Sequence, residues 1–244
     1  DTRVWGRGSR RPPGPGSGRG SSMNGFDNPE AVARYTDNPP RLVPGFADLQ
    51  KMTRLLLAET TPSDGRILVV GAGGGLELKV FAEAEPGWRF VGVDPSAEML
   101  KLARRTLGAL ADRVDLREGY VSSAPKGPFD GASCLLVLHF VPAEERVAML
   151  KEIRLRLKPG AAFVVAHHCI PDGPERILWL DRLGSFADTN GVSFDNAHGG
   201  ARALGERLPI LSPEAEVDQL RAAGFVQPEL FYSALTYRAW VSKA

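Results

Sequence analysis

The sequence predicts an α/β fold with a seven-stranded, mostly parallel sheet and helices on both of its faces. From Arg66 onward, short apolar runs alternate with longer amphipathic runs, as strands and helices do in a parallel sheet. A glycine-rich turn, Gly71 to Gly75, directly follows the first apolar run. Near the end of the chain, two strand-like runs are too close together for a crossover helix, so we expect the last strand to be antiparallel.

Composition favours one soluble domain. The 244 residues, 43% hydrophobic and 24% charged, suffice for a single sizeable core. The longest apolar run, Ala132 to Val141, contains Ser133 and His139 and is far shorter than the ~20 apolar residues that cross a bilayer. Cys134 and Cys169 lie in strand-like runs, which favours buried, reduced thiols in a cytoplasmic protein.

Residues 1–22 differ from the rest of the chain. They contain five Arg and one Asp, are rich in Gly, Pro and Ser, and show no amphipathic period. We expect a disordered tail or an expression remnant, followed by one domain over residues 23–244. Without this tail, 25 Lys and Arg stand against 28 Asp and Glu, a net charge of −3. Such a mildly acidic domain is not expected to be a general nucleic-acid binder.

The elements are expected in the following order. Residues 24–59 form an N-terminal helical cap, which Pro39-Pro40 and Pro44-Gly45 interrupt. The strands are residues 67–70, 89–94, 114–118, 132–140, 162–168, 227–233 and 235–242. The helices are residues 76–85, 96–110, 143–157 and 214–223, of which the last has Ser212 as N-cap and Pro213 in its first turn. Residues 170–211, with weak periodicity and many glycines, form an insertion after the fifth strand, over the site.

The glycine turn is the strongest local indication of a ligand. Glycine lets a backbone approach a ligand closely, and the helix that follows begins with unpaired N–H groups. Gly71, Gly73 and Gly75 stand at positions 1, 3 and 5 of the turn, whereas a dinucleotide fingerprint requires glycine at position 6, which is Leu76 here. The spacing argues against NAD, and a purely structural loop is the alternative interpretation.

Asp94 supports the ligand-binding interpretation. It ends the second expected strand about twenty residues after the glycines, where an acid accepts hydrogen bonds from ribose hydroxyls. The alternative is that Asp94 caps the helix that follows Pro95.

The glycine turn and Asp94 are followed by three further motifs: Pro128-Phe129-Asp130, Leu138-His139-Phe140 and Leu157-Lys158-Pro159-Gly160. In this order the motifs resemble those of class I S-adenosylmethionine-dependent methyltransferases. The resemblance covers residues 24–244 and implies a Rossmann-like fold, S-adenosylmethionine as cofactor and a transferase activity. Within this superfamily the chain is most similar to the tRNA wobble-uridine carboxymethyltransferases that use carboxy-S-adenosylmethionine, through residues 41–46, the insertion and residues 220–225.

The resemblance also implies a set of cofactor-binding residues. They are Arg41, Gly71, Ala72, Gly73, Gly75, Asp94, Pro95, Met99, Tyr120, Val121, Leu135 and His139. Arg41 is assigned to the carboxylate of the cofactor's methionine part, with a solvated surface role as the alternative. Two positions depart from the superfamily pattern, because Val69 replaces the usual acid on the first strand and Tyr120 replaces the usual Asp after the third.

Other departures concern the carboxylated cofactor. The carboxymethyltransferase family has Tyr at the position of Phe46, Asn at that of Leu135, and an Arg near Ala201, where Arg202 is one place away. These differences favour plain S-adenosylmethionine over its carboxy derivative.

His167 and His168 end the fifth expected strand and are the candidate catalytic bases. A neutral imidazole at the carboxyl edge could remove a proton from the acceptor. Neighbours on a strand point to opposite faces, so at most one of the two faces the site. His139, after the fourth strand, is expected to be a pocket wall. No ligand spacing suggests a metal, and none is expected.

We therefore expect methyl transfer from S-adenosylmethionine to a small-molecule acceptor. Its pocket would lie between the cap, with Tyr35 and Phe46, and the insertion, with Trp179, Phe186 and Phe194. The alternatives are a tRNA wobble-uridine carboxymethyl or methyl transferase and a non-catalytic cofactor-binding module. Nucleic acid is not the favoured partner, membrane association is not expected, and a homodimer is left open.

Overall fold

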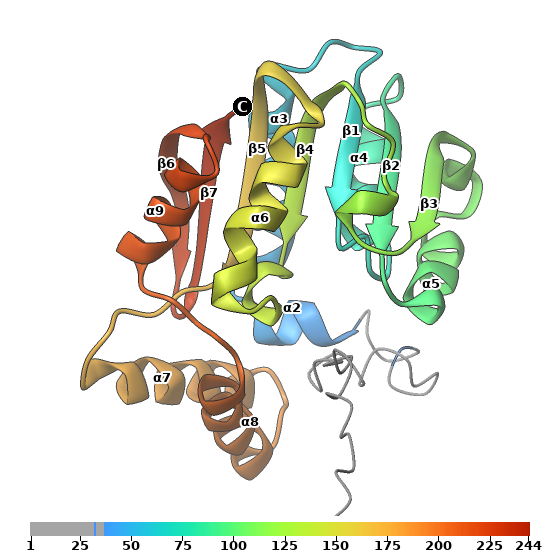
Figure 1. The fold of residues 1–244 in the computed structure, drawn as a ribbon. Coiled ribbons are helices and arrows are strands. Elements are labelled where there is room, and N and C mark those ends of the chain that lie inside the picture. The colour runs from blue at the N-terminus through green and yellow to red at the C-terminus, as the bar shows by residue number, and fades with distance from the viewer. Residues whose placement is uncertain (1–31, 33–36) are drawn as a thin grey trace, which may run out of the picture.

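The computed structural model describes Val32 and residues 37–244, so the expectations for residues 1–22, Tyr35 and the start of the cap lie outside the described residues. The described residues form a seven-stranded sheet in the order β3-β2-β1-β4-β5-β7-β6 (Figure 1). Its strands are β1 (Arg66–Val70), β2 (Arg89–Asp94), β3 (Val114–Glu118), β4 (Phe129–Leu135), β5 (Leu157–His168), β6 (Val226–Ala234) and β7 (Tyr237–Lys243). The expected α/β fold is confirmed.

The sheet is parallel except at β7. The strands from β3 through β5 pair in parallel, whereas β7 pairs antiparallel with both β5 and β6. Only Leu235 and Thr236 connect β6 to β7, and this short connection forces the hairpin geometry that the sequence predicted.

Helices cover both faces of the sheet. The helices α3 (Phe46–Ala58), α4 (Leu76–Ala84) and α5 (Ala97–Leu107) pack on one face, where Leu49 and Phe81 join a buried cluster with Val164. On the other face, α6 (Ala143–Arg154) and α9 (Pro213–Ala222) contribute Leu150 and Leu220 to a second cluster. The 3-10 helices η2 (Gly108–Arg113), η3 (Val121–Ser123) and η4 (Leu138–Phe140) lie in the connections.

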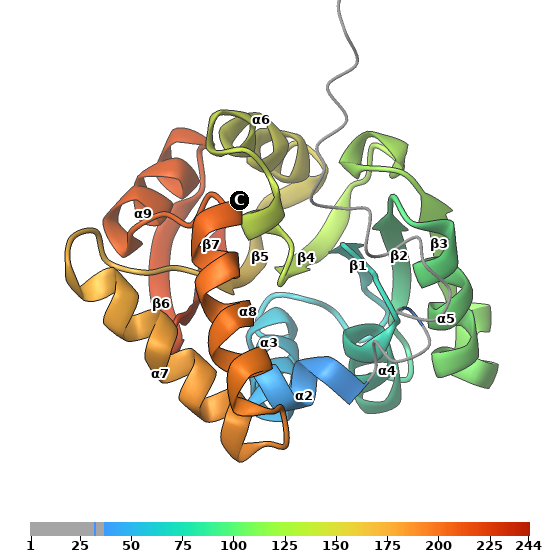
Figure 2. The same ribbon diagram turned by 90° about the horizontal axis from the view of Figure 1, so that it is seen from below.

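The insertion lies beyond the carboxyl edge of the parallel strands. It consists of α7 (Glu175–Thr189) and α8 (Phe194–Arg207), which pack together below β5, β6 and β7 in Figure 1. The short α2 (Asn38–Leu42) contacts α7 at this same end of the molecule, which Figure 2 shows from below. No helix among the described residues is long and apolar enough to span a membrane.

Two glycines of the insertion, Gly184 and Gly205, lie inside helices and permit close helix packing. A Cβ atom on Gly184 would lie 2.9 Å from His198 Nδ1, and one on Gly205 would lie 2.3 Å from Leu180 Cδ1. Both glycines are therefore located where α7 and α8 approach each other, and His198 is a residue of α8.

The predicted bounds were wrong around the fourth strand. It was expected over residues 132–140, but β4 ends at Leu135 and is followed by η4. Leu136 has a φ of 60°, which turns the chain out of the sheet, and its N–H donates to Ala166 O at 2.6 Å. The helix expected to reach residue 157 ends at Arg154, and β5 already begins at Leu157 with an irregular register against β4.

A buried ionic cluster joins β5, α6 and α9. Arg146 and Glu216 are 0% and 1% exposed, and Arg146 Nη1 donates to Glu216 Oε1 at 2.6 Å. The same guanidinium donates to Val141 O at 3.0 Å and to Pro209 O. His167 Nε2 lies 2.9 Å from Glu216 Oε2. Burial lowers the pKa of Arg146, while Glu216 acts in the opposite direction.

We expect Glu216→Ala to destabilise the fold by about 3–5 kcal/mol, because it leaves the Arg146 charge buried and unpaired. Glu214→Ala, an exposed change in the first turn of the same helix, serves as the control. Urea denaturation followed by circular dichroism measures both. Equal losses for the two variants would show that the ion pair contributes little.

Candidate functional site

The glycine turn connects β1 to α4 at the carboxyl edge of the sheet. Gly71, Gly73 and Gly75 have φ angles of 76°, 46° and 78°, in the region that favours glycine. A Cβ on Gly71 would lie 2.0 Å from Val137 Cγ2, so a larger residue cannot be accommodated there. The turn is held against β2, since the N–H groups of Gly71 and Ala72 both donate to Val93 O, at 2.8 and 2.9 Å.

Asp94 joins the end of β2 to this turn. Its Oδ2 accepts a hydrogen bond from Gly73 N at 2.9 Å, and its Oδ1 accepts one from Ser96 N at 2.9 Å. The side chain that caps α5 is that of Ser96, whose Oγ accepts from Met99 N at 3.2 Å. Asp94 therefore holds the glycine turn, and helix capping does not account for its position.

The other predicted cofactor residues lie in different surroundings. Met99 is buried against Val32 and Leu102, and Val121 belongs to the core on the α6 side of the sheet. Tyr120 is 66% exposed, while Leu135 is buried on the α4 side. The remaining predicted residues are Pro95, which is half-buried beside Asp94, and Arg41, which is exposed in the last turn of α2. Their predicted binding roles stay predictions.

Two histidines meet where β4 and β5 end. His139 in η4 and His168 in β5 have ring centroids 4.8 Å apart, and His139 Nδ1 accepts a hydrogen bond from His168 N at 3.2 Å. The His168 ring stacks on Tyr237 at 4.0 Å, and its Nδ1 lies 2.8 Å from Thr236 Oγ1. Sequence reasoning missed Thr236 and Tyr237, because only the β5–β7 pairing brings them to His168.

Burial keeps both imidazoles neutral. Desolvation lowers the pKa of His168 to about 3, with a further decrease from His167, and it places the pKa of His139 well below its usual value. Both rings are thus uncharged near pH 7.

His167 lies on the opposite face of β5. It is directed toward Glu216 and lies 5.9 Å from the Trp240 ring, among residues of the α6 and α9 side. Of the two candidate bases, only His168 thus lies beside His139. The catalytic roles of His167 and His168 stay predictions.

Glu77 is a second residue that sequence reasoning missed. It is the second residue of α4, directly behind the glycine turn, and its side chain is only 8% exposed. Ser133 Oγ on β4 donates to Glu77 Oε1 at 2.7 Å. The one indication in the sequence was a charged residue at a helix position whose neighbours are apolar.

The aromatic residues expected around the acceptor are partly engaged elsewhere. Arg182 and Arg238 lie over the Trp179 ring at 4.3 and 5.9 Å, and Phe46 packs against the core. Phe186 is half-buried, while Phe194 is 61% exposed and lies against His198.

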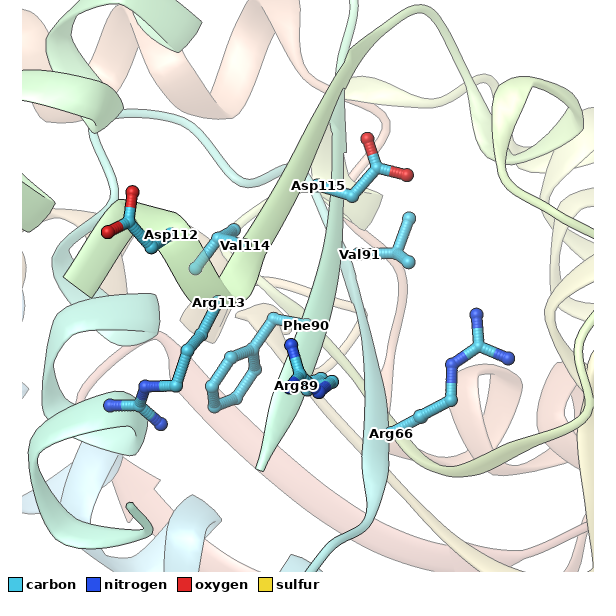
Figure 3. Close-up of a pocket in the computed structure, with 8 residues that line it drawn as sticks. All are labelled: Arg66, Arg89, Phe90, Val91, Asp112, Arg113, Val114 and Asp115. Carbon is cyan, nitrogen blue, oxygen red and sulfur yellow. The ribbon is translucent and has the colours of Figure 1, made fainter. Parts of the chain in front are cut away.

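A separate hollow of about 280 Å³ lies at the opposite edge of the sheet (Figure 3). Arg66 and Arg89, which begin β1 and β2, line it together with Arg113, Asp112 and Asp115. Arg113 is already bonded to the carbonyls of Glu85 and Trp88, at 3.0 and 3.1 Å. Because ligands of open α/β sheets bind at the carboxyl edge, this hollow is distinct from the candidate site.

Comparison with known proteins shows what this chain is similar to. Residues 68–163 match the family model described as a methyltransferase domain. The "Carboxy-S-adenosyl-L-methionine synthase" of Chromohalobacter salexigens is 26% identical over 222 residues, which cover 89% of this chain and 82% of that protein.

Solved structures agree in fold. Human N-acetylserotonin methyltransferase in complex with SAM superposes with a TM-score of 0.60 at 16% identity, covering 91% of this chain and 58% of that one. The structure titled "PigF with SAH" gives a TM-score of 0.63 at 19% identity, covering 93% and 63%. The chain thus spans about three fifths of these two proteins.

Residues 68–163 match a methyltransferase domain, and the fold is shared with solved S-adenosylmethionine-dependent methyltransferases, in agreement with the resemblance seen in the sequence. The expected similarity to a family that works with carboxy-S-adenosylmethionine is confirmed as well, because the relatives are named after this compound. These relatives are named as synthases of that cofactor, however, and not as tRNA-modifying enzymes, so the comparisons do not support the tRNA alternative.

We expect Asp94→Ala to weaken S-adenosylmethionine binding by about 1–3 kcal/mol, because ribose hydroxyls lose a charged acceptor and the glycine turn loses its restraint. Isothermal calorimetry measures the affinity, with Asp115→Ala on the neighbouring strand as the exposed control. Unchanged affinity in a folded Asp94 variant would remove this carboxylate from the site.

Gly73→Val should abolish cofactor binding, because the side chain would enter the space next to the turn at a φ of 46°. Gly191→Val provides a matched control, since Gly191 has a φ of 85° but open space around it. Both variants are strained, so a titration that shows equal affinities would contradict a role for Gly73 at the ligand.

Proposed function

We propose that this chain transfers the methyl group of S-adenosylmethionine to a small-molecule acceptor at the carboxyl edge of its sheet. The observation that supports this most directly is the bond between Gly73 N and Asp94 Oδ2, which sets a glycine turn and an acid side by side. This pair offers close backbone approach and a charged acceptor for ribose hydroxyls, so the residues present fit the cofactor.

Bound at this site, S-adenosylmethionine would supply an activated methyl group on a sulfonium. The nucleoside part would be held by Asp94 and by the turn from Gly71 to Gly75. Alignment of the two reactants in a dry site supplies much of the catalysis for such a transfer, so the main task of these residues is orientation.

His168 is the residue best placed to accept a proton from the acceptor. A base at its Nε2 requires that Nδ1–H donates to Thr236 Oγ1, 2.8 Å away, which leaves the Nε2 lone pair available. His139 accepts at Nδ1 from the His168 backbone, so its neutral ring has the proton on Nε2 and acts as a donor. The two rings would therefore offer one hydrogen-bond acceptor, at His168, and one hydrogen-bond donor, at His139, to the molecule that receives the methyl group.

A second candidate function is formation of the carboxylated cofactor, which is favoured by the names of the full-length relatives. A carboxylated product needs a cation to offset desolvation of its extra carboxylate. Arg202, the nearest residue to the aligned position, is 63% exposed and its side chain pairs with Asp181 at 3.2 Å. Ala201 is buried and uncharged. These contacts favour the plain cofactor.

Product analysis decides between the two functions. Purified protein is incubated with S-adenosylmethionine and metabolite fractions, and mass spectrometry follows S-adenosylhomocysteine, methylated small molecules and carboxy-S-adenosylmethionine. We expect S-adenosylhomocysteine together with a methylated acceptor. In a binding competition, the plain cofactor should be preferred and Arg202→Ala should leave that preference unchanged. At least tenfold tighter binding of the carboxy form, lost on this substitution, would overturn the proposal.

His168→Gln should lower the rate of S-adenosylhomocysteine formation by about 100-fold or more without changing cofactor affinity. Because the pKa of His168 is lowered to about 3, its base form persists above that pH, and the wild-type rate should show no titration of this residue between pH 5 and 8. His198→Gln on α8 is the control. An unchanged rate in the His168 variant would exclude it as the base.

A cytoplasmic location and a homodimer are part of the same proposal. Both are consistent with a small-molecule transferase whose Cys134 and Cys169 are buried free thiols. Size-exclusion chromatography with light scattering tests the dimer.

A further inference from the structure

Glu77 occupies an unusual position for a carboxyl group. It lies in the first turn of α4, two residues after Gly75, and its side chain points into the protein toward β4. Burial raises the pKa of Glu77 to about 8, against the opposite effect of the Ser133 hydrogen bond. A group of this kind is costly to bury unless a partner stabilises its charge.

The partners of Glu77 leave half of the carboxyl group available. Ser133, which is 0% exposed, donates to Oε1 at 2.7 Å. Among the described residues, Oε2 has no hydrogen-bond partner, and no Lys, Arg or His pairs with Glu77. The structure thus provides a buried acid, fixed by one hydroxyl, without a countercharge.

Sheet register places this acid beside the glycine turn. Ser133 pairs with Val69 across the β1–β4 ladder, and paired residues of neighbouring parallel strands point to the same face. The Glu77 carboxyl therefore lies next to the Val69 side chain, two residues before Gly71. Val69 is the position at which the sequence lacked an expected acid, and the carboxyl reaches the same region from α4.

We propose that Glu77 binds the amino group of the cofactor's methionine part, in place of an acid at position 69. The proposal rests on the proposed use of S-adenosylmethionine. The ammonium group would provide the missing countercharge, and the N-terminal end of α4 favours the ionised carboxylate. Ser133 fixes the carboxyl so that Oε2 is the oxygen left for the ligand.

Three ligands separate this role from a structural one. S-adenosylmethionine and S-adenosylhomocysteine both contain the amino group, whereas 5′-methylthioadenosine keeps the nucleoside and the sulfur but lacks it. Glu77→Gln preserves the shape and a hydrogen-bonding oxygen for Ser133 while it removes the charge. We expect this variant to bind the two amino-containing ligands at least tenfold more weakly and 5′-methylthioadenosine within twofold of wild type.

Isothermal calorimetry provides the affinities and thermal unfolding checks the fold. Glu83→Gln, an exposed change on the same helix, is the matched control and should alter no affinity. If Glu77→Gln does not fold, Ser133→Ala keeps the carboxyl but frees it from its hydroxyl. That variant should show the same selective loss with a smaller magnitude.

The outcomes separate the two proposals. Wild-type protein that binds none of the three ligands would contradict the proposed function itself. Wild-type binding together with equal losses for all three ligands, or with no loss for any, would overturn the role of Glu77 and leave the proposed function intact.

Discussion

The guanidinium of Arg146 connects the end of η4 to the insertion and to α9. It is fully buried and joins Val141, which lies just after η4, to a distant part of the chain that contains Pro209 at the end of the insertion and Glu216 in α9. Buried carbonyls need hydrogen-bond donors, and a buried charge needs a countercharge, so each of these contacts depends on the others. The position of η4, and with it His139, therefore depends on an ion pair that touches no ligand.

The cofactor side depends on a different set of contacts. There the backbone of the glycine turn is tied to Val93 and to the Asp94 carboxylate, which makes β1 and β2 one unit at their carboxyl ends. The sheet order places β1 beside β4, so the turn and the histidine pair meet at the centre of the sheet. The hydrogen bond from Ser133 on β4 to Glu77 on α4 connects these two parts of the sheet.

Much of this arrangement could be predicted from local sequence. The bounds of β2 and β3 match the prediction, because the apolar run of β2 ends at Asp94 and the alternating apolar and charged residues of β3 end at Glu118. Ser212 caps α9 as expected and accepts from Ala215 N at 3.4 Å. These features depend on residues a few positions apart, which periodicity and capping rules describe well.

The features that were missed depend on contacts between distant residues. The helices α7 and α8 were not predicted, because the periodicity of residues 170–211 is weak, and only the fold shows that Gly184 and Gly205 lie against the partner helix. The end of β4 was misplaced because Leu136 adopts a positive φ, which nothing in an apolar run announces. The Glu77–Ser133 bond joins residues 56 positions apart, so only the fold could reveal it.

The charges around the site are consistent with a cationic cofactor and an uncharged base. Asp94 and Glu77 bring carboxyl groups to the cofactor side, where a sulfonium and an ammonium would arrive. His139 and His168 are held neutral where the proposed acceptor would bind. Arg202 is paired with Asp181 on the surface of the insertion, so its charge is directed toward α7. An extra carboxylate on the cofactor would meet acids on one side and neutral rings on the other, which is the electrostatic reason to favour the plain sulfonium.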